Sequence, residues 1–349
     1  MPPPRNNLSW KALIFIRQSS YTETTSPAPS TFQPLLMRLF SPPLLLGLLA
    51  SVMLSGCALF GGSKAIDLQL TLQPGDVFIL ETITDQDIQQ TVMGMDQSID
   101  QKIGYTFRQE VSGVTDEGHY QIKVTYDRML FEQSSTMGSV AYDSQDPPEP
   151  VPAQAKGYAA MVGKGFEMTM DQQGEVLRIE GLDAMLDQVL DEVSAEQPMA
   201  PEARTTFKQQ FGENSMKQNM ASLAGFYPDQ PVNVGDHWEI IQKKAGATAM
   251  RIQTDYVLAK AEEGVLTLGA KGDISPVPDA APTVMGGMEL AYQLSGTQSG
   301  TLLVDQATGL LNSGTLTQQV SGTITMTGGP AGEMEWPITI DSEIVMKKL

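Results

Sequence analysis

The chain has 349 residues, of which 22 are basic, 41 are acidic, 20 are methionine and one, Cys57, is cysteine. This excess of negative charge excludes the basic surface that a phosphate backbone requires, so we expect no nucleic-acid partner. A single cysteine cannot form an internal disulfide, and stability must therefore come from a packed core.

The N-terminal region has the features of a secretory signal peptide in their usual order. Arg38 carries the positive charge, and residues 39–53 form the apolar stretch. That stretch is too short for a membrane-spanning helix, which needs about 20 apolar residues, and its length is typical of a signal peptide. We therefore expect residues 37–56 to be removed after export.

The last three residues of this signal peptide and the residue that follows them resemble the lipobox of bacterial lipoproteins. The resemblance implies that a signal peptidase recognises Leu54, Ser55 and Gly56, cuts before Cys57, and leaves the thiol carrying diacylglycerol. Cleavage removes four basic residues and one acidic residue, which leaves 18 basic and 40 acidic residues and a net charge of −22. An anionic bilayer surface repels such a protein, so we expect the lipid itself to hold it on the membrane.

Composition and periodicity divide the chain into six expected segments. They are an upstream extension that is either disordered or the result of a start codon assigned too early (1–36), the signal peptide (37–56), a lipidated tether (57–64), a first β-rich half (65–180), a helical connector (181–226) and a second β-rich half (227–349). Fold reasoning is restricted to the part after the signal peptide.

Apolar and polar residues alternate through most of the sequence after residue 65, as in half-buried strands. The alternation is clear in residues 66–72 and 120–126, and it returns in residues 238–345. Residues 182–193 instead carry apolar side chains at helical spacing. The expected fold is mainly antiparallel β, a β-rich α+β arrangement of two duplicated curved sheets or half-barrels with a helical segment between them.

Three landmarks recur in the same order and indicate the duplication. They are Pro74–Leu80 and Val234–Ile240, the acidic turns at 116–118 and 262–264, and the turns at Met170–Gly174 and Val304–Gly309. In each pair a glycine supplies the positive φ of a turn and an acid accepts hydrogen bonds from the local backbone. Acid–glycine turns are common in β proteins, so the inference depends on the shared order of all three.

The chain resembles a family of bacterial lipoproteins that contain a domain of unknown function. The resemblance covers about residues 65–347 and is carried by the lipobox and by four segments, namely 124–128, 142–144, 163–166 before 170–174, and 231–238. These segments mark strands and turns. The family has no agreed activity, so the resemblance implies no catalytic residue.

The sequence contains no recognisable catalytic or metal-binding motif. The two histidines, His119 and His237, do not have the spacing of a zinc site, which needs three or four converging ligands. A G-x-S-x-G nucleophile motif and the glycine motifs of nucleotide-binding folds are also missing. We expect no enzymatic activity, no metal and no cofactor.

Methionines cluster beside glycines in two places and could line an apolar binding surface. Met93 and Met95 flank one glycine, and Met285 and Met288 flank two. Methionine side chains adapt to varied apolar partners, so these four residues with Trp238 are the candidate ligand surface. The alternative is that the methionines fill gaps in the core of a curved sheet.

These observations predict a lipoprotein of the cell envelope that is anchored through its N-terminal lipid and binds an apolar ligand or a partner protein. The ligand would be a lipid or an apolar peptide. One alternative is a structural or scaffold lipoprotein with a filled core, and another is an unrecognised hydrolase. Because Ala58, rather than Asp, follows the cysteine, the expected location in a Gram-negative organism is the periplasmic side of the outer membrane.

Overall fold

The computed structural model describes residues 65–349, apart from residues 137, 197, 200, 245–248, 279, 281, 286–287 and 330–331. Residues 64–349 form one compact unit. The predicted signal peptide, the lipobox and Cys57 lie outside the described residues.

The described part of the chain is mainly antiparallel β, as predicted, and its thirteen strands belong to one sheet. The strands are β1 (Val77–Val92), β2 (Met95–Val114), β3 (Tyr120–Ser135), β4 (Gly138–Asp143), β5 (Gly165–Met170), β6 (Val176–Glu180), β7 (His237–Lys244), β8 (Met250–Glu262), β9 (Val265–Pro276), β10 (Thr283–Met285), β11 (Met288–Asp305), β12 (Leu311–Gly329) and β13 (Gly332–Lys348). The helices are η1 (Ala153–Ala155), α1 (Lys156–Met161), α2 (Leu182–Glu196), α3 (Pro201–Phe211) and α4 (Glu213–Ala224).

The strand order is β6-β5-β3-β2-β1-β13-β12-β11-β9-β8-β7, with β4 paired to β3 and β10 paired to β11. The two predicted halves therefore have corresponding strand orders, and α2, α3 and α4 lie between them in sequence. They differ from the prediction in forming one sheet instead of two. The reason is β13, the last strand of the second half, which pairs with β1 of the first half on one side and with β12 on the other, so that neither half keeps a free edge there.

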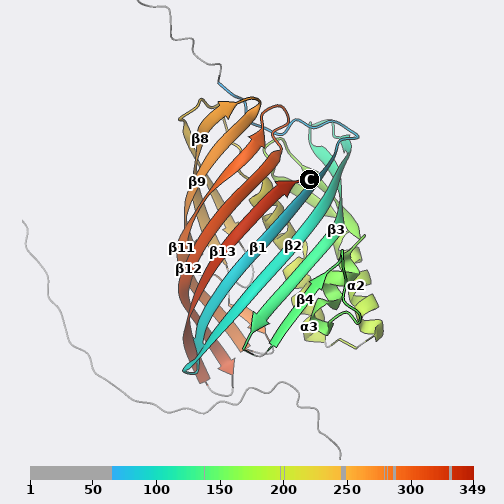
Figure 1. Cartoon of the computed structure of the whole chain (residues 1–349), viewed down its shortest axis with the longest axis vertical. Coiled ribbons are helices and arrows are strands. Elements are labelled where there is room, and N and C mark those ends of the chain that lie inside the picture. The colour runs from blue at the N-terminus through green and yellow to red at the C-terminus, as the bar shows by residue number, and fades with distance from the viewer. Residues whose placement is uncertain are drawn as a thin grey trace, which may run out of the picture. The chain divides into compact units, whose positions relative to one another are not determined.

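The sheet curls (Figure 1), and α4 contacts both of its outer strands, β6 and β7. Lys217 Nζ donates a hydrogen bond to the backbone oxygen of Leu177 on β6, over 3.4 Å. Gln242 Nε2 on β7 donates to the backbone oxygen of Ala221 over 3.0 Å. The helical connector thus closes the gap between the sheet edges.

A row of polar side chains crosses the concave face of the sheet and separates two apolar clusters. Gln86, Ser342, Gln318, Gln298, Gly272 and Thr254 are consecutive register partners on β1, β13, β12, β11, β9 and β8. Side-chain hydrogen bonds of 2.6–3.0 Å join Gln86 to Ser342, Gln318 to Gln298, and Gln298 to Thr254. The larger cluster, on the side of Ile344 and Leu316, also contains the helices, and the smaller one begins at Ile340 and Val320.

Candidate ligand-binding site

The N-terminal segment, residues 66–72, crosses one end of the curled sheet (Figure 1). Its alternation places Leu68, Leu70 and Leu72 in the larger apolar cluster with exposed fractions of 3%, 3% and 6%. The predicted period of two is therefore correct. The segment is not a strand of the sheet, however, and makes only one isolated bridge, from Ile66 to Val232.

Two turns, one from each half of the sheet, hold the N-terminal segment. Leu70 N donates to the backbone oxygen of Gln172, after β5, over 2.8 Å. Thr71 N donates to the backbone oxygen of Thr308, after β11, over 2.9 Å. The backbone hydrogen bonds that a strand would make within a ladder go to these turns instead, which explains why the alternating pattern does not give a sheet strand here.

These two turns are the third predicted landmark, and in both halves an aspartate accepts backbone hydrogen bonds and a glycine closes the turn, although the second turn is one residue longer. The carboxylate oxygen Oδ1 of Asp171 accepts hydrogen bonds from two backbone N–H groups at 2.8 and 2.9 Å, and that of Asp305 accepts two at 2.8 and 3.1 Å. Gly174 and Gly309 close the turns with φ of 75° and 71°. Such a φ is accessible to glycine at little cost, as the sequence predicted.

Two buried tyrosines connect the turns and the N-terminal segment to the body of the protein. The Tyr227 hydroxyl donates to the backbone oxygen of Gly309 over 2.8 Å. The Tyr120 hydroxyl donates to the backbone oxygen of Leu70 over 3.0 Å. Burial raises the pKa of Tyr227 far above its ordinary value, so its hydroxyl remains a donor at all physiological pH values.

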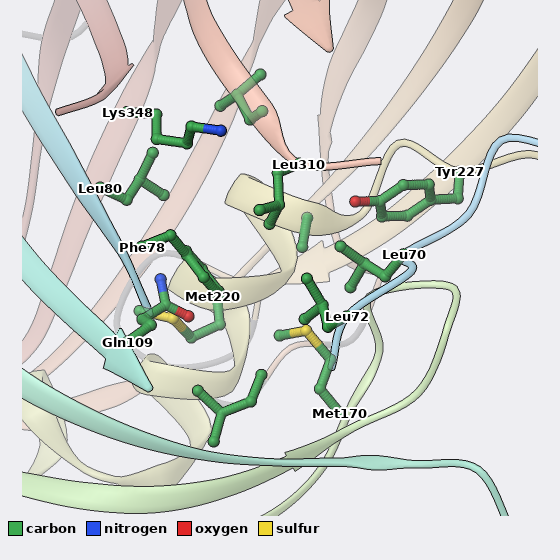
Figure 2. A pocket seen from close by; sticks show the side chains of 13 residues that line it. Leu70, Leu72, Phe78, Leu80, Gln109, Met170, Met220, Tyr227, Leu310 and Lys348 are labelled. Carbon is green, nitrogen blue, oxygen red and sulfur yellow. The ribbon is translucent and has the colours of Figure 1, made fainter. Parts of the chain in front are cut away.

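An apolar cavity of about 50 Å³ lies beside the N-terminal segment, within the larger cluster (Figure 2). Its walls are Leu70, Leu72, Phe78, Leu80, Gln109, Ile122, Met170, Met220, Ala224, Tyr227, Leu310, Leu311 and Lys348. A volume of this size holds a few water molecules. A longer ligand would have to displace wall side chains, and methionines such as Met170 and Met220 adapt readily.

The cavity adjoins an open groove of about 330 Å³, a volume within the roughly 300–1,000 Å³ range of small-molecule sites. Phe78, Leu310 and Lys348 line both spaces. The remaining groove residues are Asp76, Val77, Ile79, Thr308 and Leu349. The geometry therefore offers an apolar interior, an open mouth and one amine at the boundary between them.

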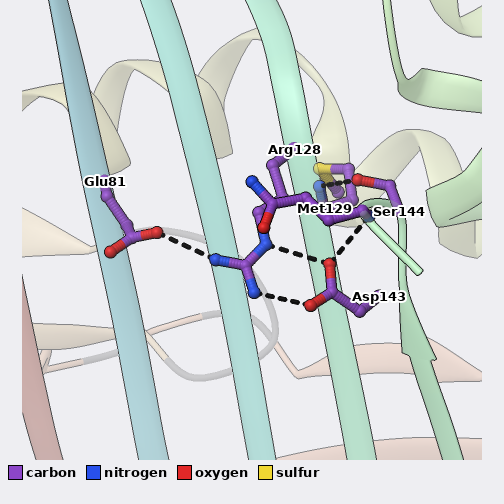
Figure 3. Close-up of polar contacts among 6 residues, drawn as sticks. Glu81, Arg128, Met129, Asp143 and Ser144 are labelled. Carbon is purple, nitrogen blue, oxygen red and sulfur yellow. Dashed lines mark hydrogen bonds and ion pairs between the residues drawn. The ribbon is translucent and has the colours of Figure 1, made fainter. Parts of the chain in front are cut away.

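A second site, which is polar, lies on the outer face of β1, β2 and β3 (Figure 3). Arg128 donates to both carboxylate oxygens of Asp143, over 2.9 and 2.6 Å, and to Glu81 over 3.0 Å. The Arg128 guanidinium lowers the pKa of Asp143. In register terms Arg128 reaches from β3 across Thr106 on β2 to β1, and Thr106 is only 6% exposed.

This outer site brings together two of the segments that carry the family resemblance, 124–128 and 142–144. Tyr126 from the first segment faces the interior and is fully buried. Ser144 from the second accepts a hydrogen bond from Met129 N through its hydroxyl, over 3.1 Å. Arg128 pairs with both carboxylates, Glu81 on β1 and Asp143 on β4, so these three residues form a clamp between strands.

The residues predicted as an apolar ligand surface do not lie together. Met93 and Met95 are at the β1–β2 turn with exposed fractions of 46% and 61%. Met285 on β10 and Met288 on β11 are backbone register partners. Trp238 packs against the larger cluster, and its indole donates to the backbone oxygen of Phe226 over 2.9 Å. None of these five residues lines the cavity or the groove.

Within residues 65–349, as far as they are described, no group of three or more His, Cys, Asp or Glu side chains could hold a metal ion. His237 faces outward and contacts Asp255 over 3.0 Å. In the same described part, no helix has the length and apolar character needed to cross a bilayer.

The residues of the cavity and groove escaped sequence reasoning because they come from distant parts of the chain. One of them, Lys348, could have been identified from the sequence. Continuing the period of two from Ile338 through Ile344 and Met346 to the end of the last strand places Lys348 on the inner face. A charged residue at an inward position is uncommon enough to mark a candidate site.

Comparisons with solved structures give low similarity. A structure of lipovitellin, described in terms of its lipid–protein interactions, has 10% identity and a TM-score of 0.44; the match covers 80% of this chain and 25% of that chain. The chain thus spans about a quarter of lipovitellin. A domain from Vibrio parahaemolyticus, described as that of an outer membrane lipoprotein-sorting protein, has 7% identity, a TM-score of 0.12 and coverages of 75% and 83%. At these TM-scores neither similarity bears on function.

Sequence comparison is more informative about the family. No curated protein matches the chain. A family described as being of unknown function, DUF6263, matches residues 117–311, which is more than half of the chain and includes parts of both halves of the sheet. The expectation of an uncharacterised family is confirmed, whereas the duplication and the lipid anchor stay predictions. The chain therefore belongs to DUF6263, a family of unknown function.

Proposed function

We propose that this protein is a lipid-anchored, non-enzymatic binding protein of the cell envelope, and that it holds an apolar chain in the cavity and groove beside its N-terminal segment. The observation that carries the proposal is that the two spaces adjoin and have Phe78, Leu310 and Lys348 as common wall residues. Apolar walls with a few polar groups at the mouth are the usual composition of a small-molecule site.

The proposal is tested by native mass spectrometry after gentle extraction of the protein from membranes. Leu310→Trp should place a bulky side chain at the boundary of groove and cavity, which Leu310 lines on both sides, and abolish co-purification of lipid. Leu303→Trp is the control, because Leu303 is 37% exposed and outside both spaces. Lipid on the wild type and the control, but not on Leu310→Trp, is the expected result.

A wild-type protein that carries no lipid would favour the alternative of a scaffold with a filled core. The small volume of the cavity, about 50 Å³, is the observation in favour of that alternative. Retention of lipid by Leu310→Trp would place the ligand elsewhere and overturn the proposed site.

The proposed anchor is tested separately through Cys57, since the cysteine is the residue that would carry the lipid. Cys57→Ser should move the protein from the membrane fraction to the soluble fraction. Because the lipid is expected to supply membrane binding on its own, a Cys57→Ser protein that stays with the membranes would contradict the anchor while leaving the ligand site untouched.

A further inference from the structure

We infer that the ligand is a single-chain amphiphile with an anionic head group, a carboxylate or a phosphate, and that Lys348 binds that head group. This inference rests on the proposed function and adds the chemistry and the orientation of the ligand. The chain would enter the cavity, and the head group would remain at the boundary with the groove.

The first observation is the direction of Lys348. It is the last residue of β13, and its inward-facing neighbours on that strand are Ser342, Ile344 and Met346. Figure 2 shows its amine on the same side of the cavity as Leu80 and directed towards Leu310. The inward positions of the flanking strands carry uncharged side chains, which are residues 78, 80, 82, 84, 86, 88 and 90 on β1 and residues 314, 316, 318, 320, 322, 324 and 326 on β12.

The second observation is that the Lys348 amine, unlike the backbone of this residue, which pairs with Leu80, has no hydrogen bond or ion pair with any residue that the structure describes. Two acids lie near it, and both serve their own turns. Asp305 accepts hydrogen bonds from Thr308 Oγ1 at 2.7 Å and from two backbone N–H groups. Asp76, in the groove, accepts one from Gln73 N at 2.7 Å.

The positive charge of Lys348 does interact with the carboxylate of Asp305. The Thr308 hydroxyl and, more weakly, the charge of Lys348 lower the pKa of Asp305. No ion pair forms between them, so the amine keeps its donors available to a ligand.

The third observation is the composition of the site, in which one amine lies among mostly apolar side chains. A wholly apolar ligand would cover Lys348 and leave a charge without a partner, which is costly in an apolar setting. A cationic head group would be repelled. A carboxylate or phosphate would form a charge-assisted hydrogen bond with the amine, while its chain replaced water against Phe78, Leu310 and the leucines of the N-terminal segment.

The test is isothermal titration calorimetry on the full chain carrying Cys57→Ser, with four ligands that share a dodecyl chain and are kept below their critical micelle concentrations. The ligands are dodecanoate, dodecyl phosphate, dodecanol and dodecyltrimethylammonium. We expect the two anions to bind about tenfold or more tightly than dodecanol, as one hydrogen bond to a charged group implies, and the cation to bind most weakly. The two anionic arms identify which head group is preferred.

Lys348→Met should remove the preference for anions and leave the affinity for dodecanol within about twofold, because the methionine keeps the apolar stem. Lys348→Arg should keep the preference. Lys347→Met is the matched control, since Lys347 is the preceding residue on β13 and is exposed on the opposite face, and it should change nothing.

The outcomes separate the two claims. Equal binding of dodecanol and the anions, or an anion preference that survives Lys348→Met, would overturn the role of Lys348 and leave the proposed function standing. Failure of all four ligands to bind would overturn both. Loss of the preference in Lys347→Met would show that net charge, not position, is responsible.

Discussion

Arg128 shows how single residues hold the outer face of the sheet together. It lies on β3, and its contacts with Asp143 on β4 and Glu81 on β1 span three strand pairings. The side chains of Arg128, Glu81 and Asp143 are only 21%, 20% and 29% exposed. Breaking the group would leave two partly buried carboxylates without their counter-charge, which costs more than losing a surface ion pair.

Arg128→Met should therefore destabilise the protein by about 1–3 kcal/mol, the range for losing hydrogen bonds to charged groups. Urea unfolding at pH 7 measures this. Arg178→Met is the control, because the Arg178–Glu180 pair is 69% and 52% exposed, and a surface change of this kind usually stays within about 0.5 kcal/mol. Equal effects of the two substitutions would show that the clamp is unimportant.

The same clamp predicts a dependence on pH. Its hydrogen bonds from Arg128 lower the pKa of Asp143 below the ordinary 3.8, so the folded state favours the charged carboxylate. The stabilisation is complete above the ordinary pKa and is lost as pH falls through the lowered one. The stability difference between wild type and Arg128→Met should thus be full at pH 7 and shrink below about pH 4. A difference that grows on acidification would contradict the assignment.

At the scale of elements, the N-terminal segment and its two turns form one unit. Gly309 illustrates how closely they pack, because a Cβ atom there would lie 2.2 Å from the backbone oxygen of Gln69. Backbone atoms cannot move aside as a flexible side chain can. Glycine is therefore required both by the positive φ of the turn and by the approach of the segment.

Gly309→Ala should displace the N-terminal segment, whereas Gly264→Ala should not. Both glycines have positive φ, 71° and 78°, so both substitutions carry the conformational cost of about 1–2 kcal/mol. The space around a Cβ at Gly264 is open. Hydrogen exchange of residues 66–72 distinguishes them: it should accelerate in Gly309→Ala alone, and similar exchange in both variants would refute the close packing.

At the scale of the whole molecule, the sheet and its larger core join the two halves. β13 pairs with β1 over residues 338–348, and the larger cluster takes buried side chains from β2, β3 and β5 as well as from β8, β9 and β11. Neither half can keep this core without the other. The halves should accordingly behave as one cooperative unit.

Urea unfolding should show a single transition for both halves, because they share one core. Hydrogen exchange by mass spectrometry at increasing urea can follow β3 and β12 separately. The two strands should lose protection at the same midpoint. Two well-separated midpoints would mean that the halves fold independently, as two separate sheets would.

Particular elements show which structural features could be predicted from the sequence. The glycine turns were predictable because positive φ and side-chain acceptors leave a local signature; Asp76 and Asp236 each accept from the backbone N three residues earlier, both over 2.7 Å. The helix at 182–196 was predictable from its apolar spacing. Met93 and Met95 do not line the cavity or the groove, and methionine content does not reveal which face of a turn a side chain occupies.

The sequence by itself determined the secondary-structure class, the turns and the helical connector, since these depend on the alternation, spacing and φ preferences of neighbouring residues. Only the tertiary structure decided that β13 unites the halves in one sheet, that α4 bridges the sheet edges, and that Lys348 faces an apolar cavity beside Leu70 and Leu310. Such contacts join residues far apart in the chain. They depend on strand order and on the curl of the sheet, for which a single sequence carries no local signal.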